Sequence, residues 1–132
     1  MSPEVSLAVL DYGMGNLRSV DKGFERAGAT CAVTADHDRI EAADGVVLPG
    51  VGAFPKAMSR IQELGLDQAL RAAADRGQPV LGICLGLQLL FESSTELGGA
   101  EGIGLLKGTV VEIPAGGRKI PHIGWAAVTW AR

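Results

Sequence analysis

The sequence predicts an α/β fold, a doubly wound and mostly parallel sheet with a β extension toward the C-terminus. Short apolar runs alternate with segments of helical periodicity from Val5 to Phe91, which is the pattern of parallel strands joined by crossover helices. Glycine or proline marks the ends of most of these segments. After residue 91 the spacing of apolar residues becomes β-like, so the extension is expected there.

Length and composition indicate one globular domain. The 132 residues are enough for a single domain with a real core, expected over residues 1–132. Apolar residues make up 47% of the chain, which excludes a disordered protein. The formal net charge of −3, without a basic patch, argues against a nucleic-acid partner. No apolar run is long enough to cross a membrane and no signal peptide is evident, so we expect a cytoplasmic protein.

The first strand is expected over residues 5–10 and is followed by a turn at 11–16. Asn16 can cap the next helix, expected over 17–27, and Gly28 can end it. The Gly-x-Gly in the turn invites a dinucleotide-binding interpretation. The third glycine and a ribose-binding acid are missing, so helix capping is the better account.

Two further strands are expected at 30–34 and 46–48, and Cys31 on the first of them is interpreted as a buried core thiol. His37, among acidic residues between these strands, is interpreted as a solvated surface histidine. The two cysteines, Cys31 and Cys84, lie far apart in the sequence and no metal ligands cluster. We therefore expect no disulfide, no metal site and no cofactor.

The third strand leads into Pro-Gly-Val-Gly at residues 49–52. Two glycines around one valine allow backbone N–H groups to face a ligand and allow a peptide to flip without steric cost. An ordinary loop is the alternative. Such loops gather at the carboxyl ends of parallel strands, where Cys84 is also expected, so this segment is interpreted as an oxyanion loop.

Helices are expected over 55–64 and 67–76, with a break at Gly65 and a stop at Gly77, because apolar residues recur at core spacing in both. Later in the chain, residues 93–104 are glycine-rich and acidic and predict a loop that contains Glu96. Beyond this loop, β-type alternation appears, and strands are expected at the two ranges 108–113 and 123–130.

Cys84 stands between a short buried strand at 79–81 and a helix expected over 85–91. Gly82 and Gly86 flank it, so a sharp turn can carry the thiol without clashes between Cβ atoms. This is the pattern of a nucleophile elbow with sulfur in place of oxygen. At a helix N-terminus the dipole and free N–H groups favour a thiolate. A small buried cysteine is the alternative, but the paired glycines favour the nucleophile.

Gln88 follows Cys84 by one helical turn, so its side-chain amide can face the same pocket. A buried structural hydrogen bond is the alternative for this glutamine.

Three separated motifs support a family resemblance: Pro-Gly-Val-Gly at 49–52, Gly-Ile-Cys-Leu-Gly-Leu-Gln-Leu-Leu at 82–90, and Lys-Ile-Pro-His-Ile-Gly-Trp at 119–125. Together they resemble the class I, triad-type glutamine amidotransferases. The third motif and Asp-Tyr-Gly-Met-Gly-Asn-Leu at 11–17 narrow the resemblance to the glutamine amidotransferase subunits of imidazole glycerol phosphate synthase, in histidine biosynthesis. The resemblance covers essentially every residue and implies a flavodoxin-like sheet.

The resemblance implies a role for each matched residue. Cys84 would attack the side-chain amide of L-glutamine and form a thioester, releasing ammonia. Backbone N–H groups of Leu85 and of the Val51/Gly52 peptide would stabilise the oxyanion. Three residues would help to hold the substrate: Gly50, Gln88 and Glu96.

The resemblance also implies a partner. Ammonia would pass through a channel to a cyclase subunit, a (β/α)8 barrel, which adds it to a ribulose-phosphate nucleotide intermediate. His122 and Trp125 belong to the motif that lies near the contact with the cyclase in this family. The expected assembly is a cytoplasmic heterodimer without nucleic acid or membrane.

The chain departs from the family pattern at the general base. The family's histidine and its orienting glutamate come in a late His-x-Glu motif, which residues 1–132 lack. We do not assign this role to His122, because the family places its base elsewhere. We therefore expect the N-terminal part of such a subunit, with little glutaminase activity alone, because the thiolate would lack its proton shuttle.

Two other functions stay open from the sequence. A Cys-elbow hydrolase or glyoxalase-type protein could use the same fold without needing the 49–52 loop or Gln88. Alternatively, an inactive truncated module could only dock on a cyclase-like barrel.

Overall fold

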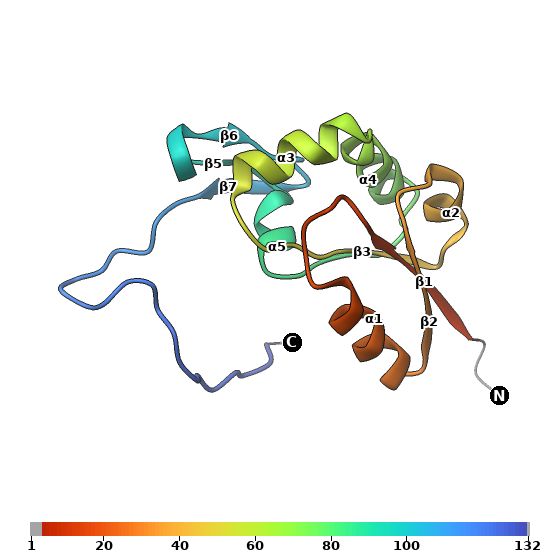
Figure 1. The fold of residues 1–132 in the computed structure, drawn as a ribbon, viewed down its shortest axis with the longest axis horizontal. Helices are drawn as coiled ribbons and strands as arrows, with labels where there is room; N and C mark the ends of the chain where they lie inside the picture. The colour runs from red at the N-terminus through yellow and green to blue at the C-terminus, as the bar shows by residue number, and fades with distance from the viewer. Residues whose placement is uncertain (1–3, 132) are drawn as a thin grey trace.

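A computed structural model describes residues 4–131, which form a parallel sheet with its helices and a smaller second sheet (Figure 1). The main sheet contains β1 (Val5–Leu10), β2 (Ala29–Thr34), β3 (Gly45–Leu48) and β4 (Val80–Gly82). The helices are α1 (Leu17–Arg26), α2 (His37–Ala42), α3 (Phe54–Glu63), α4 (Leu66–Asp75) and α5 (Leu85–Leu89). The second sheet contains β5 (Phe91–Ser94), β6 (Ala100–Glu101) and β7 (Leu106–Val110), with a 3₁₀ turn, η1 (Glu96–Gly98), between its first two strands.

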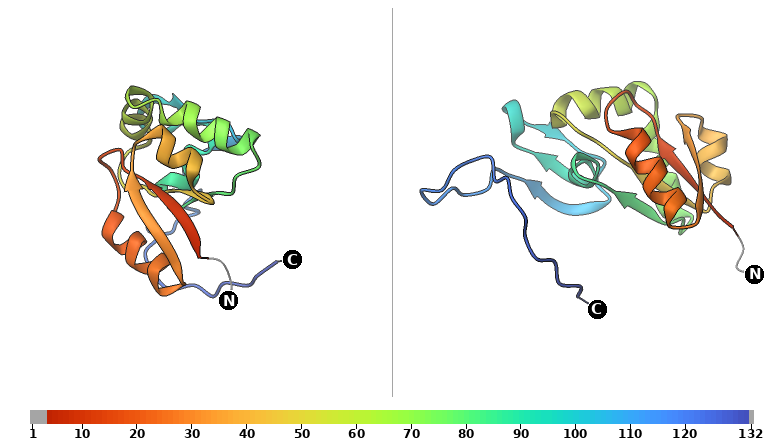
Figure 2. Two further views of the ribbon diagram at one scale, coloured as in Figure 1. Left: turned by 90° about the vertical axis from the view of Figure 1, so that its right-hand side faces the viewer. Right: turned by 60° about the horizontal axis from the view of Figure 1, so that its bottom comes forward.

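The strand order of the main sheet is β2-β1-β3-β4, and every neighbouring pair is parallel. Helix α1 lies on one side of this sheet, and α3 and α4 lie on the other (Figures 1 and 2). The predicted doubly wound α/β fold is therefore confirmed. The order reverses between β1 and β3, and ligands of such sheets bind at the carboxyl ends of the strands beside this point.

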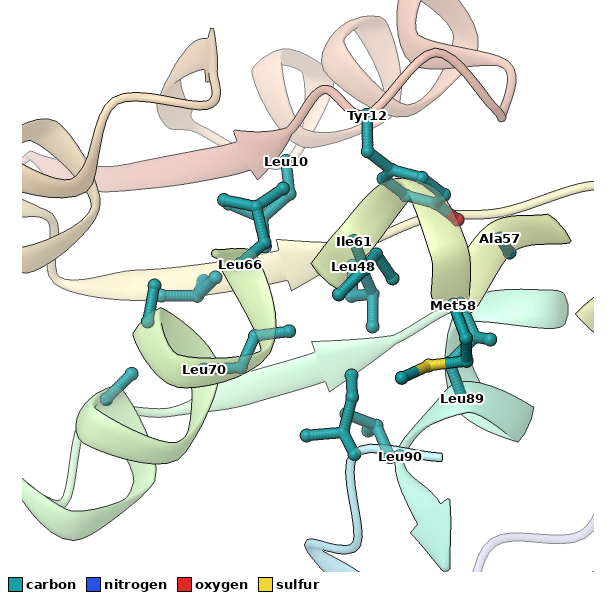
Figure 3. Close-up of a cluster of buried hydrophobic side chains, with 14 of the residues drawn as sticks. Leu10, Tyr12, Leu48, Ala57, Met58, Ile61, Leu66, Leu70, Leu89 and Leu90 are labelled. Carbon is teal, nitrogen blue, oxygen red and sulfur yellow. The ribbon is translucent and has the colours of Figure 1, made fainter. Parts of the chain in front are cut away.

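The main core fills the space between the sheet and helices α2 to α5 (Figure 3). Leu10 from β1 and Leu48 from β3 meet Ile61 of α3 and Leu70 of α4, and all four side chains are fully buried. Burial of one such side chain contributes about 1.5–3 kcal/mol. The carboxyl ends of β1 and β3 are thus held in the buried core.

The opposite face of the sheet is covered less completely. Helix α1 contains no fully buried residue, although its apolar residues face the sheet at half-burial. Leu81 on the edge strand β4 stays 50% exposed. The predicted core position of Cys31 is wrong, because β2 is the other edge strand and α1 shields the thiol only in part. Partial burial, together with nearby Asp21 and Glu25, raises the pKa of Cys31.

The helix boundaries follow the local signals in the sequence. The Asn16 side chain accepts a hydrogen bond from the Ser19 N–H at 3.4 Å and caps α1, as predicted. Asp36 caps α2 in the same way, through the Arg39 N–H at 3.0 Å. Gly65 adopts a left-handed conformation, φ +67°, and separates α3 from α4 where the break was expected.

The β extension is present, but three of its details were wrong. The helix after Cys84 ends at Leu89, and Phe91 begins β5 instead of continuing the helix. The expected loop at 93–104 holds the end of β5 and all of β6, which pair antiparallel, while β5 pairs parallel with β7. Residues 111–131 contain no strand, so the strand expected over 123–130 is absent. β-type alternation forms a strand only where a partner supplies backbone hydrogen bonds, and this segment has none within residues 4–131.

Candidate active site

Cys84 lies in a strained turn between β4 and α5. Its backbone has φ +57° and ψ −121°, a conformation that side chains other than glycine rarely adopt. A methyl group at Gly82 would lie 2.6 Å from Leu87 Cα, and one at Gly86 would overlap the carbonyl oxygen of Leu48. The turn therefore requires both glycines, for the steric reason predicted from the sequence. The Cys84 side chain is exposed, as a nucleophile must be.

The loop at 49–52 lies against this turn. The Ile83 N–H donates to the Leu48 carbonyl at 2.9 Å, which joins the ends of β3 and β4. A methyl group at Gly50 would lie 3.0 Å from the Gly86 nitrogen, so the loop and the start of α5 are in close contact. Val51 is 53% exposed and follows the buried Gly50. The fold thus brings the predicted oxyanion loop beside Cys84.

Backbone donors of the loop and of the first turn of α5 are unpaired. Within residues 4–131, the N–H groups of Leu85, Val51 and Gly52 donate no hydrogen bond to another protein group. Gly52 has φ +108°, a backbone conformation that residues with a side chain rarely adopt, so the loop needs glycine at this position. Unpaired N–H groups beside a nucleophile are suited to stabilising a negative oxygen that develops during attack on a carbonyl.

Glu96 has a structural partner that the sequence did not indicate. Its carboxylate accepts a hydrogen bond from the Phe54 N–H at 2.9 Å, across 42 residues of sequence. This contact caps α3, whose N-cap residue Ala53 offers no side-chain acceptor. Glu96 therefore fixes the end of the 49–52 loop as well as facing a cavity.

That cavity, of about 430 Å³, contains two of the three residues expected to hold a substrate. Gln88 and Glu96 line it together with residues of β5, β7 and the segment after β7. Cys84 does not line it, although Gln88 lies one helical turn away from Cys84. Gly50, the third expected residue, is the buried second residue of the 49–52 loop and does not line the cavity.

The residues expected at a partner interface lie outside the elbow and the loop. His122 lines a separate apolar cavity of about 570 Å³, formed within residues 113–122. Trp125 has a relative exposure of 104% and contacts little of the chain. His37 is exposed as predicted, with its Nε2 atom 3.0 Å from the Leu64 carbonyl oxygen. In the described range 4–131, neither histidine lines the cavity of Gln88 and Glu96.

Tyr12 is a site residue that the sequence analysis missed. Its hydroxyl donates a hydrogen bond of 2.6 Å to the carbonyl of Pro49, and its side chain is 1% exposed. Burial, and secondarily the charge of Cys84, raise the pKa of Tyr12 to about 12. The available signal was its place two residues after β1, because the loops after β1 and β3 meet at the switch point of the sheet.

The ionisation of Tyr12 predicts a pH dependence of stability. Its pKa is about 12 in the folded chain, against 10.0 for an ordinary tyrosine. Above pH ~10 the unfolded state loses this proton first, so the free energy of unfolding falls between about pH 10 and pH 12. At lower pH both states keep the proton and Tyr12 adds no slope. Urea unfolding across this range should show a steeper fall for the wild type than for Tyr12→Phe, and equal slopes would contradict the assignment.

Two kinds of feature are absent from residues 4–131. No helix within residues 4–131 has the length and apolar character needed to cross a membrane. The same residues contain no group of three His, Cys, Asp or Glu side chains placed to share a metal ion.

Comparison with known proteins identifies relatives over nearly the whole chain. The family model "Glutamine amidotransferase class-I" matches residues 8–128. A protein of Moorella thermoacetica named imidazole glycerol phosphate synthase subunit HisH is 54% identical over 126 residues, covering 96% of this chain and 60% of that protein. The HisH subunit of Aquifex aeolicus is 54% identical over 118 residues, covering 89% of this chain and 56% of that protein. The chain thus spans little more than half the length of these relatives.

A solved structure shares the fold. The crystal structure of a glutamine amidotransferase superposes with a TM-score of 0.68 and 20% sequence identity, covering 80% of this chain and 55% of that one. At 20% identity this similarity is evidence for the fold alone, and that fold agrees with the doubly wound sheet described above.

Proposed function

Because the chain belongs to the class-I glutamine amidotransferases, we propose that it forms the nucleophile-bearing part of the glutaminase of imidazole glycerol phosphate synthase. One observation carries the proposal: an exposed Cys84 on a strained elbow stands beside a loop whose N–H groups are unpaired. The names of the similar Moorella and Aquifex proteins support the choice of synthase. Activity, substrate and partner are proposed here, because the chain spans only part of those proteins.

The proposed reaction begins at Cys84. Its thiolate attacks the side-chain carbonyl carbon of L-glutamine, and the carbonyl oxygen takes up the negative charge of the tetrahedral intermediate. The N–H groups of Leu85 and of the Val51/Gly52 peptide receive that charge, and each such donor is worth about 3–4 kcal/mol in comparable sites. Collapse breaks the carbon–nitrogen bond, and ammonia leaves after gaining a proton. Water then hydrolyses the γ-glutamyl thioester to glutamate and regenerates the thiol.

The proton transfers need a general base, and no hydrogen bond to the Cys84 thiol is found within residues 4–131. His37 is engaged at Leu64, and His122 lies in the segment after β7. We assign this role to the family's His-x-Glu pair, which residues 1–132 do not contain. Without it, thiolate formation and ammonia departure both lack a proton shuttle.

The cavity beside the elbow is proposed as the substrate site. A carboxylate such as Glu96 is suited to the ammonium group of glutamine, and the Gln88 amide can accept or donate hydrogen bonds to the amino-acid end. Gly50 would contribute indirectly: because it has no side chain, the 49–52 loop can lie close to the first turn of α5. Glu96 also caps α3, so the same carboxylate would bind the substrate and hold the end of the 49–52 loop.

The proposed partner is a cyclase with a (β/α)8 barrel, which would receive the ammonia. The segment after β7 supports a protein partner, because four of its large apolar side chains are at least 77% exposed. They are Ile123, Trp125, Val128 and Trp130. Aromatic residues of this kind often anchor interfaces. The heterodimer would work in the cytoplasm, where a nucleophilic thiol stays reduced.

Affinity labelling tests the proposed function. The electrophilic glutamine analogue 6-diazo-5-oxo-L-norleucine should modify Cys84 in the complex with the cyclase, and excess L-glutamine should prevent this. Cys31, the matched free thiol outside the site, should stay unmodified in the same peptide map. Labelling by iodoacetamide but never by the glutamine analogue would favour a Cys-elbow hydrolase of another specificity.

A further inference from the structure

We propose that Tyr12 is a positioning residue of the oxyanion loop, which fixes the Pro49–Gly50 peptide so that the following N–H groups face the substrate. The inference rests on the proposed function, since the loop acts as an oxyanion loop only if Cys84 attacks a carbonyl. The role concerns the geometry of the loop, and Tyr12 itself touches no substrate.

The first observation is the hydrogen bond at the start of the loop. The Tyr12 hydroxyl donates to the Pro49 carbonyl at 2.6 Å, and both residues are buried. A peptide unit is planar, so fixing the Pro49 carbonyl also fixes the Gly50 N–H in the opposite direction. The proline ring restricts the preceding dihedral angle as well. The first freely rotating bonds of the loop are therefore those of Gly50.

Gly50 itself is confined by the same hydroxyl. A methyl group at Gly50 would lie 2.5 Å from the Tyr12 hydroxyl oxygen and 3.0 Å from the Gly86 nitrogen. Tyr12 and the first turn of α5 thus both lie against the position of a Gly50 Cβ atom. This close fit links the direction of the Val51 N–H to the position of the elbow that carries Cys84.

The rest of the turn after β1 encloses the loop from the same side. The Met14 methyl group lies 2.9 Å from the position that a Cβ atom at Gly52 would occupy. A Cβ atom at Gly15 would lie 3.5 Å from the Gly50 nitrogen. Residues 11–16 therefore cap α1 through Asn16 and also hold the loop after β3. Helix capping is the structural role that the sequence predicts for this turn, and contact with the loop is a second one.

The far end of the loop has its own anchor in Glu96, through the Phe54 N–H. Both ends are thus held by side chains from distant parts of the sequence, while Val51 and Gly52 between them stay exposed. Tyr12 supplies the one hydrogen bond to the Pro49 carbonyl that is found among residues 4–131. Its loss would leave a buried carbonyl unpaired, which favours rotation of that peptide toward another donor.

The test compares three variants, Tyr12→Phe, Met14→Ala and Thr34→Val. Each is made in a subunit that carries the proposed His-x-Glu pair and is assembled with the cyclase. Tyr12→Phe removes only the hydroxyl, and we expect kcat for glutamine to fall about 10- to 100-fold. This decrease is no larger than the one caused by removing a direct oxyanion donor. KM for glutamine and the rate of Cys84 alkylation by iodoacetamide should be unchanged, because neither depends on a stabilised oxyanion. Met14→Ala, at a half-buried position, should lower kcat less than Tyr12→Phe does, again without a change in KM or in the alkylation rate.

Thr34→Val is the matched control. Thr34 is 7% exposed at the end of the neighbouring strand β2, and its hydroxyl accepts a hydrogen bond from the Asp36 N–H at 3.0 Å. Its loss removes a buried hydroxyl partner without touching the 49–52 loop, so kcat should stay at the wild-type value. A kcat of Tyr12→Phe and Met14→Ala no lower than that of Thr34→Val would overturn the proposal.

The outcomes separate this inference from the proposed function. A wild-type complex whose subunit carries the His-x-Glu pair and that still turns over no glutamine rejects the proposed function. In that case the crystal structure of Tyr12→Phe still decides the inference, through the orientation of the Pro49–Gly50 peptide relative to the wild type. A displaced peptide supports the positioning role of Tyr12, and an unmoved one overturns it.

Discussion

Replacement of Cys84 by alanine is expected to lower glutamine hydrolysis by the complex with the cyclase by about 10⁴-fold or more. The reason is chemical, because no other group at the elbow can form the thioester. Cyclisation supplied with free ammonia should continue at the wild-type rate, since that step belongs to the partner. The measurement is the release of glutamate from glutamine, compared with product formed from ammonium salts.

Cys31→Ala is the matched control for this prediction. Cys31 is the other free thiol, half-buried on the edge strand β2 and outside the site. Its replacement should leave both reactions unchanged. If Cys84→Ala retained glutamine hydrolysis, the assignment of Cys84 as the nucleophile would fail. Partner binding that survived without loss of any function would favour a docking module.

Replacement of Gly86 by alanine is expected to lower the free energy of unfolding by about 3 kcal/mol or more. The added methyl group would overlap the Leu48 carbonyl oxygen, which is main chain of the central strand β3 and is already bonded to the Ile83 N–H. Neither group can move without separating β3 from β4. Urea unfolding followed by circular dichroism measures the loss.

Gly23→Ala gives the control with the opposite sign. Gly23 lies inside α1, and a Cβ atom there would meet nothing within 4 Å. Alanine should therefore stabilise the helix by about 0.5–1 kcal/mol. Equal effects of the two substitutions would show that the close approach of α5 to β3 does not govern the stability of the elbow.

The parts of the fold that local signals specify could be predicted from the sequence. The strand β1 has the predicted bounds, and Asn16 and Gly65 mark helix ends through capping and a left-handed conformation. The elbow at Cys84 was predictable for the same reason, since two glycines two residues away on each side are needed by the turn itself. Such features depend on neighbouring residues, which the sequence displays directly.

The features that were missed depend on residues far apart in the chain. Tyr12 meets Pro49 across 37 residues, and Glu96 meets Phe54 across 42. Neither contact leaves a periodic pattern or a spacing to detect. The strand that begins at Phe91 and the absent strand at 123–130 have the same cause, because the available partner strand decides which apolar alternation becomes a strand.

The exposed segment after β7 has a consequence for spectroscopy. Both tryptophans of the chain, Trp125 and Trp130, lie there with almost no contact to the core, whereas the one tyrosine is buried beside the 49–52 loop. Tryptophan emission from this protein should therefore be red-shifted before any denaturant is added, and it should change little when the α/β core unfolds. A blue shift on mixing with a partner would report docking of that segment. Tryptophan fluorescence should therefore measure binding but not unfolding of the core.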